Sequence, residues 1–148
     1  MLYQAVLIVM ITLLGLNPSQ ATEETYLAIA NKKSGTASFV NLKTKKQYSV
    51  NVGYLPHEIA VDGDYAYVTN YGSAHVRSTS LSDKPGNSIA VIDLKTFTIV
   101  KQIDLGAKIC APHGIVASAK NKRVYVTCEA RHEIIVIDTL SRDVLHSI

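Results

Sequence analysis

Hydrophobic positions beyond residue 24 come in short runs that polar turn residues separate. Runs at 65–70, 89–92 and 134–137 are rich in Val, Ile, Tyr and Thr and are too short to favour helices. Some are apolar at successive positions, so both faces of the sheet must be covered. The pattern predicts an all-β chain of short antiparallel strands in stacked sheets.

The strand pattern itself repeats along the chain. Residues 56–70 (PHEIAVDGDYAYVTN) align with 112–128 (PHGIVASAKNKRVYVTC), and 87–106 align with 132–148 through a shared Val-Ile-Asp. A degenerate copy at 25–53 has Asn41 in place of the aspartate. Four short strands, here called A to D, repeated at roughly 40 to 45 residues are the signature of a propeller blade.

We therefore predict a partial β-propeller with four-stranded antiparallel blades over residues 22–148. A first blade contributes strands B to D at 25–53, a second blade lies at 56–106 and a third at 112–148. Propellers typically have roughly four to eight blades. The expectation is an N-terminal part of a longer propeller, and a ring-closing oligomer through open blade edges is the alternative.

Four sequence features together resemble the YVTN-repeat β-propeller family of exported bacterial proteins. They are the motif Tyr67 to Asn70 (YVTN), the Pro-His strand starts, the segment Val91 to Thr96 (VIDLKT) and the Leu105-Gly106 ending. The resemblance covers essentially all of the chain after residue 21. It implies a fold and no single activity, because such propellers serve as periplasmic binding proteins, surface-layer components or scaffolds of cofactor enzymes.

The first 21 residues indicate export. Residues 5–16 (AVLIVMITLLGL) form an uncharged apolar run, shorter than the roughly 20 residues of a membrane-spanning helix. Ser19-Gln20-Ala21 then offers small residues where a signal peptidase reads the chain. We predict a signal peptide at 1–21, a periplasmic or secreted protein and no membrane span after cleavage. Because no Lys or Arg precedes the apolar run, an uncleaved N-terminal anchor is the alternative.

Composition and charge argue against several other classes. A hydrophobic fraction of 47% and a charged fraction of 18% suit a folded protein. The formal net charge of +3 comes from 15 basic and 12 acidic residues in scattered groups, so nucleic acid is not an expected partner. The sequence contains no dinucleotide fingerprint, phosphate-binding loop, nucleophile elbow or haem-attachment motif. No catalytic residue and no cofactor is predicted.

Candidate binding residues gather at one edge of the predicted blades. In a blade, the D-to-A and B-to-C connections lie on one face of the disc, and strand A lines the central channel. His57 and His113 begin the A strands of the second and third blades. The connection from Asn70 to Asp93 spans 23 positions, which is 13 more than its equivalent in the third blade. This insert is expected to project over the two histidines.

The channel mouth is therefore the predicted ligand-binding site, suited to an anionic small molecule or a metal ion. The candidate residues are His57, His113, Tyr71, His75 and Arg77. In the alternative interpretation, each Pro-His pair is structural: Pro fixes φ and His bonds a nearby carbonyl. Of these two ligands the metal ion is the less favoured, and no metal site is predicted, because no two potential ligands have a short spacing such as His-x-His. Glu58 is expected to point away from His57, its neighbour on the strand.

Two cysteines flank the first hairpin of the third blade. Folding that hairpin about residues 119–122 puts Cys128 opposite His113 and brings Cys110 to the same rim. In an oxidising compartment the two cysteines would form a disulfide. Two unpaired thiols are the alternative.

Several other polar residues recur at equivalent positions and are predicted to be structural. Asp93 and Asp138 both follow a strand C, so we expect them to cap turns rather than to catalyse a reaction. Tyr67 and Tyr125 share one position in strand B and are expected to pack between blades.

The leading functional hypothesis is an exported, non-enzymatic β-propeller that binds a protein or a small molecule through its loop-rich face. The alternative is the N-terminal part of a propeller enzyme, such as a lactone hydrolase or the scaffold of a redox cofactor. Its active residues would converge on the channel mouth from all blades.

Overall fold

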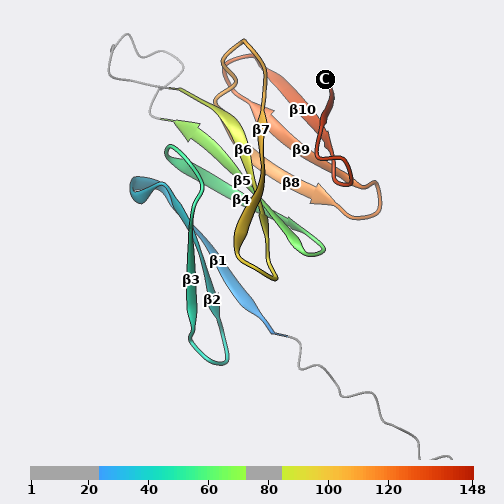
Figure 1. Ribbon diagram of the computed structural model, residues 1–148. Coiled ribbons are helices and arrows are strands. Elements are labelled where there is room, and N and C mark those ends of the chain that lie inside the picture. The colour runs from blue at the N-terminus through green and yellow to red at the C-terminus, as the bar shows by residue number, and fades with distance from the viewer. Residues whose placement is uncertain (1–23, 73–84) are drawn as a thin grey trace, which may run out of the picture.

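The computed structural model describes residues 24–72 and 85–148 (Figure 1). The predicted signal peptide, His75 and Arg77 lie outside these residues. Among the described residues, no helix is long and apolar enough to cross a membrane. The elements are β1 (Tyr26–Asn31), the 3-10 turn η1 (Lys32–Ser34), β2 (Thr36–Asn41), β3 (Gln47–Asn51), β4 (Pro56–Asp62), β5 (Tyr65–Gly72), β6 (Pro85–Asp93), β7 (Thr98–Asp104), β8 (Pro112–Ser118), β9 (Arg123–Cys128), β10 (Glu133–Asp138) and β11 (Val144–Ser147).

The strands form three antiparallel sheets that follow one another along the chain (Figure 1). The first sheet has the order β1-β2-β3, the second β4-β5-β6-β7 and the third β8-β9-β10-β11. Each sheet is a meander in which neighbours in sequence are neighbours in space. The predicted all-β fold class is confirmed, and β4 and β8 take the place of the A strands.

Two hydrophobic cores join the sheets, and the central sheet contributes one face to each. Ala66 and Val68 of β5 pack with Phe39 of the first sheet, whereas Tyr67, between them in sequence, packs with Val124 of the third. Side chains alternate across a strand, so a continuous apolar run covers both faces at once. This explains why the strands of the central sheet are hydrophobic at successive positions.

Tyr67 is fully buried between the second and third sheets, as predicted. Its equivalent, Tyr125, lies on the outer face of the third sheet, where it lines an apolar depression of about 270 Å³ together with Val116 and Ile134. Val116 is 59% exposed and Ile134 41%. The same repeat position is therefore interior in the second sheet and at the surface in the third. The reason is that, among the described residues, no further sheet packs against the outer face of the third sheet.

The turn after each strand C is built in the same way in all three sheets. Asn41 Oδ1 accepts hydrogen bonds from the amides of Lys43 and Thr44. Asp93 and Asp138 do the same for the amides two and three residues later. The predicted capping role of these side chains is confirmed. The turns close through a residue with positive φ, namely Lys45, Phe97 and Arg142.

The turn at Asp138 yields a pH prediction. Its pKa lies below the usual value because the Ser141 and Leu140 amides bond the carboxylate, and Arg123 adds a favourable charge. A depressed folded-state pKa stabilises the fold above the unfolded-state value of about 3.9, and that stabilisation is lost as the pH falls through the folded-state pKa.

We therefore expect Asp138→Asn to be less stable than the wild type at pH 7, with the difference shrinking as the pH falls below about 4. Denaturant unfolding at a series of pH values measures this difference. Asp104→Asn is a matched control outside these turns, and its effect should be smaller at pH 7. A difference between Asp138→Asn and the wild type that grows in acid would contradict the prediction.

Asn70, at the end of β5, ties the second sheet to the first. It is buried, and its Nδ2 donates to the carbonyl oxygen of Val52 at 2.9 Å and to Ser88 Oγ at 3.1 Å. The side-chain amide of the equivalent Asn31 donates to Thr36 Oγ1 and Ser38 Oγ, which belong to its own sheet. Within residues 24–72 and 85–148, the asparagine of the YVTN motif therefore makes a side-chain contact between blades that its counterpart does not make.

Asn70→Ala should lower the free energy of unfolding by about 1–3 kcal/mol, because it removes the donor of a buried hydrogen-bond network. Asn31→Ala should cost less, since Asn31 is itself only partly buried and its partners lie within one sheet. Chemical denaturation of both variants makes the comparison. If the two variants lose equal free energy of unfolding, the contact between the sheets adds nothing to stability.

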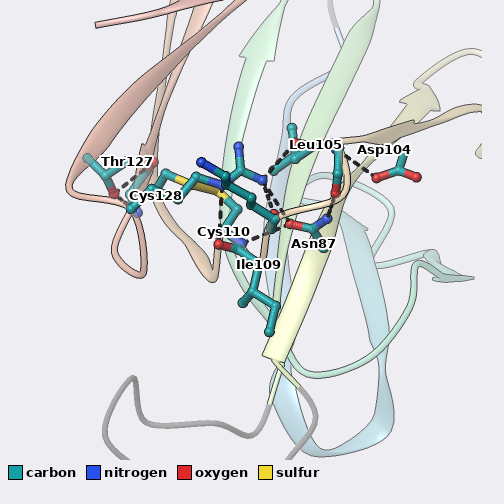
Figure 2. The surroundings of a disulfide bond; sticks show 11 residues. Asn87, Asp104, Leu105, Ile109, Cys110, Thr127 and Cys128 are labelled. Atoms are coloured by element: carbon teal, nitrogen blue, oxygen red, sulfur yellow. Dashed lines mark hydrogen bonds between the residues drawn. A yellow bond between two sulfur atoms is a disulfide. The ribbon is translucent and has the colours of Figure 1, made fainter.

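A disulfide joins Cys110 to Cys128, with 4.8 Å between their Cα atoms (Figure 2). Both cysteines are buried. Cys128 pairs across the hairpin with Pro112, so the predicted pairing with His113 is wrong by one residue. The cause is a bulge in β8, described below. Arg131 fixes the same loop through bonds to the carbonyl oxygens of Leu105, Lys108 and Ile109.

Candidate functional site

Strands β4 and β8 begin with the same β-bulge. In β4, Pro56 pairs with Asn70 and the next paired residue is Ile59, opposite Val68. Two residues of β4, His57 and Glu58, therefore face a single residue of β5. The bulge in β8 is equivalent: Pro112 pairs with Cys128 and Ile115 with Val126, which leaves His113 and Gly114 opposite Thr127.

A threonine hydroxyl holds each bulge. Thr69 Oγ1 accepts a hydrogen bond from the Glu58 amide at 2.9 Å. Thr127 Oγ1 accepts one from the Gly114 amide at 2.8 Å. Thr69 also donates to the carbonyl oxygen of His113 at 3.0 Å, which ties the start of β8 to the second sheet. The threonines of the YVT motif thus fix the backbone on which the two histidines stand.

The bulge changes the direction of Glu58. In a regular strand its side chain would point away from His57, as the sequence pattern predicts. Instead, Glu58 Oε1 lies 3.9 Å from His57 Nδ1 and 3.9 Å from His113 Nδ1. The expectation that Glu58 points away from His57 is therefore wrong, and one carboxylate oxygen lies equally far from the two imidazoles.

Glu58 occupies space that the third sheet leaves open. Its Oε2 accepts a hydrogen bond from the Ile115 amide at 3.2 Å. The residue of β8 equivalent to Glu58 is Gly114, and a Cβ added there would lie 3.8 Å from Glu58 Oε2 and 3.2 Å from Thr127 Oγ1. A side chain at Gly114 would therefore be crowded by the Thr127 hydroxyl of its own hairpin, whereas its contact with Glu58 would be an ordinary one.

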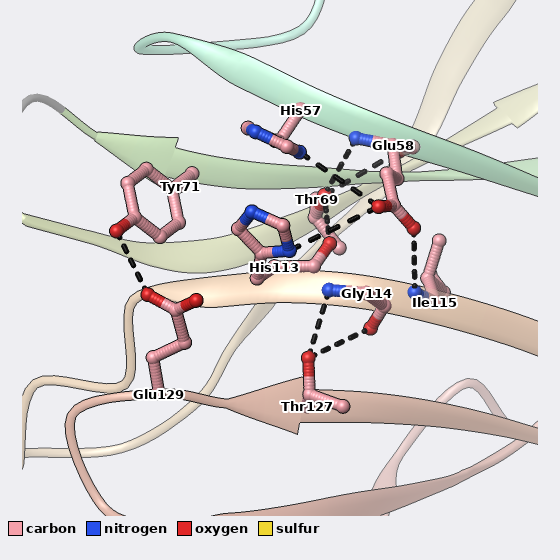
Figure 3. A network of polar contacts seen from close by, with 9 residues as sticks. All are labelled: His57, Glu58, Thr69, Tyr71, His113, Gly114, Ile115, Thr127 and Glu129. Atoms are coloured by element: carbon pink, nitrogen blue, oxygen red, sulfur yellow. Dashed lines mark hydrogen bonds and ion pairs between the residues drawn. The ribbon is translucent and has the colours of Figure 1, made fainter.

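Three predicted site residues meet at this edge (Figure 3). The ring centroids of His57 and His113 are 3.9 Å apart, and that of Tyr71 lies 5.5 Å from His57 and 5.3 Å from His113. Tyr71 follows Asn70 in β5 and is buried. The side chains of His57, Glu58 and His113 are 27%, 44% and 34% exposed, so a ligand can reach them. His75 and Arg77, the other two candidates, lie outside the described residues.

This edge, where β4 and β8 begin, is called the rim below. Burial and nearby charges at the rim shift the pKa values of His57 and Tyr71. Burial lowers the pKa of His57, and the nearby His113 and Lys32 add to the effect, while Glu58 and Glu129 oppose it. Burial raises the pKa of Tyr71, and its hydrogen bond to Glu129 does the same. His57 is therefore a neutral imidazole at neutral pH, with a lone pair available on one ring nitrogen.

Glu129 and Lys32 complete the rim around Tyr71. The tyrosine hydroxyl donates to Glu129 Oε2 at 2.8 Å, and Lys32 Nζ lies 5.2 Å from the centre of the tyrosine ring. The sequence pattern directs Glu58 away from the site and gives no reason to expect Glu129 or Lys32 there. A threonine recurs near the end of strand B, as Thr69 before Asn70 and as Thr127 before Cys128. This repeat is the one sequence signal that could have indicated the bulge and, through it, the position of Glu58.

Comparison with solved structures establishes the fold. The WD40 domain of Neurospora crassa Pan2 superposes with a TM-score of 0.58 at 20% identity, over 80% of this chain and 36% of that one. WD40 repeats form β-propellers. The chain has a β-propeller fold. No protein-family model and no curated protein matches the sequence.

Two further structures are similar to this chain. Hydrazine synthase of Kuenenia stuttgartiensis shares 29% identity, with a TM-score of 0.64 over 82% of this chain and 32% of that one. The dihydro-heme d1 dehydrogenase NirN, solved in complex with DHE, shares 16% identity, with a TM-score of 0.61 over 83% and 25%. The chain therefore spans about a third or less of the length of the first proteins that it matches.

Proposed function

We propose that this chain is part of an exported, YVTN-like β-propeller that acts as a binding scaffold, and that its ligand is held where β4 and β8 begin. The observation that carries the proposal is the meeting of His57, His113 and Tyr71, which come from two consecutive sheets. Residues that converge from separate blades onto one accessible rim are what a propeller binding site requires.

The composition of the rim supports a small polar ligand. Two imidazoles, a tyrosine ring and two carboxylates supply donors, acceptors and aromatic surface within a small area. The bulges and the threonine hydrogen bonds hold these groups on rigid strands rather than on loops, which favours preorganised binding. The apolar outer face of the third sheet supports the further proposal that the whole protein contains additional blades.

Nuclear magnetic resonance of the histidine rings tests the proposal. The purified full chain, free of metal, would be titrated with a library of small carboxylates, phosphate, amines and heteroaromatic compounds. We expect at least one class to shift the ring resonances of His57 and His113 saturably, while those of His146, exposed on β11, stay in place. No shift with any compound, or shifts confined to His146, would overturn the proposal.

A propeller enzyme is the second candidate, because two of the similar structures are a synthase and a dehydrogenase by name. In this case the rim would contribute part of an active site that other blades complete. The purified protein should then carry a bound redox cofactor visible in its absorption spectrum, or turn over a lactone. If full-length protein has neither property, the scaffold is favoured.

A further inference from the structure

Three potential metal ligands converge at the rim from two different blades. One donor atom from each of His57, Glu58 and His113 lies within 4.8 Å of the other two. They are two imidazole nitrogens and one carboxylate oxygen, and Figure 3 shows the three side chains pointing toward one another. No short sequence spacing indicates this group, because two of its members are 56 residues apart.

Contacts within the protein leave this group incompletely satisfied. The two distances from Glu58 Oε1 to the imidazole Nδ1 atoms, 3.9 Å each, are longer than a hydrogen bond of about 2.7–3.2 Å. Among the described residues, His57 Nδ1 is buried and has no hydrogen-bond partner. A buried polar atom without a partner in a native structure needs an explanation, and a bound ion is one that fits this group of donors.

The surrounding hydrogen bonds orient the donors as a metal site requires. The Ile115 amide occupies Glu58 Oε2, which directs Oε1 toward the imidazoles. Thr69 bonds both the Glu58 amide and the His113 carbonyl, so one side chain sets the spacing of the two strands that carry the ligands. Such outer contacts typically tune metal affinity by about 10–100-fold.

On this basis we propose that His57, Glu58 and His113 bind a divalent transition metal, with Zn²⁺ as the ion whose preferences they fit best. The inference rests on the proposed function, since it names the first ligand of the same rim. Two His and one Glu form a three-residue donor set that leaves one zinc position open for water or a further ligand. Mg²⁺ and Ca²⁺ prefer oxygen donors and are disfavoured.

The observed distances suit this ion after small side-chain movements. Tetrahedral zinc with bonds of about 2.0–2.2 Å places its donors about 3.3–3.5 Å apart. The distances of 3.9 Å from Glu58 Oε1 to the imidazole nitrogens exceed this by less than 1 Å. Rotation of three partly exposed side chains can close such a gap without moving the backbone.

The experiment titrates Zn²⁺ alone into untagged, metal-free full chain by calorimetry and uses Co²⁺ as a spectroscopic probe. We expect saturable 1:1 binding, with visible Co²⁺ absorption bands that Zn²⁺ abolishes and Mg²⁺ does not. His57→Ala, His113→Ala and Glu58→Gln should each weaken Zn²⁺ binding at least about tenfold. His146→Ala, on exposed β11, should leave it unchanged.

Circular dichroism in the presence of a chelator checks that each variant folds, and Glu58→Gln keeps the size of the side chain. The proposal is overturned if Zn²⁺ does not saturate the wild type, or if binding survives in all three rim variants. The histidine titration separates the two claims. If small molecules shift His57 and His113 but Zn²⁺ does not bind, only the metal inference fails. If Zn²⁺ binds but no small molecule binds, either to the metal-free or to the Zn²⁺-loaded protein, the proposed small-ligand function fails.

Discussion

Phe39→Ala should lower the free energy of unfolding by about 3–5 kcal/mol, the usual cost of removing a fully buried aromatic side chain. Phe39 is 1% exposed and belongs to the core between the first and second sheets. Its ring centroid lies 5.4 Å from that of Phe97, which in turn lies 3.9 Å from that of Tyr48. These neighbours are expected to fill little of the space left by the deletion, because they stack on one another from β3 and from the turn between β6 and β7.

Denaturant unfolding of the full chain measures this effect, with Leu42→Ala as the matched control. Leu42 follows the same strand but is 45% exposed, so its loss should change stability by no more than about 0.5 kcal/mol. If Phe39→Ala costs less than about 1 kcal/mol, the first sheet does not pack on the second as described. The unit of three sheets would then not fold cooperatively.

Replacing Cys110 and Cys128 together with alanine should cost about 3 kcal/mol under oxidising conditions, in the chain-entropy treatment of a disulfide. The two residues are 18 apart in sequence, and the cross-link restricts the unfolded chain over that loop. It also joins the segment leading into β8 to the end of β9, at the edge where His113 stands.

The unfolding free energy of the double variant must be compared with that of the oxidised wild type and with that of the reduced wild type. Oxidised wild type should be more stable by about 3 kcal/mol, and most of the difference should disappear when a reductant opens the disulfide. Loss of side-chain packing alone would survive reduction, so the two causes are separable. An unchanged unfolding midpoint on reduction would contradict the prediction.

The sequence was sufficient to predict the sheets and their repetition. Apolar runs such as 89–92 indicate strands buried on both faces, and the recurrence of Val-Ile-Asp places the turns that Asp93 and Asp138 cap. These features depend on local chemistry and on a period that can be counted along the chain. The meeting of His57 and His113 follows from that period, since both begin equivalent strands.

The role of Glu58 does not follow from the pattern of hydrophobic positions, because it depends on strand register. One extra residue in β4 turns the side chain toward His57, and the pattern of hydrophobic positions does not show such a bulge. The positive φ of Leu55 and Ala111, each directly before a proline, is also not visible in the sequence, since residues other than glycine rarely adopt this conformation. Tertiary contacts impose both features, so both appear only in the folded chain.

The measurement that tests the account most directly is a nuclear Overhauser experiment on the full chain with labelled histidine rings. The central claim is that consecutive blades bring His57 and His113 into contact, with ring centroids 3.9 Å apart. The account predicts strong cross-peaks between the ring protons of these two residues and from each of them to Tyr71. Cross-peaks from His57 and His113 only to residues of their own strands would contradict it, and with it both proposals for the rim.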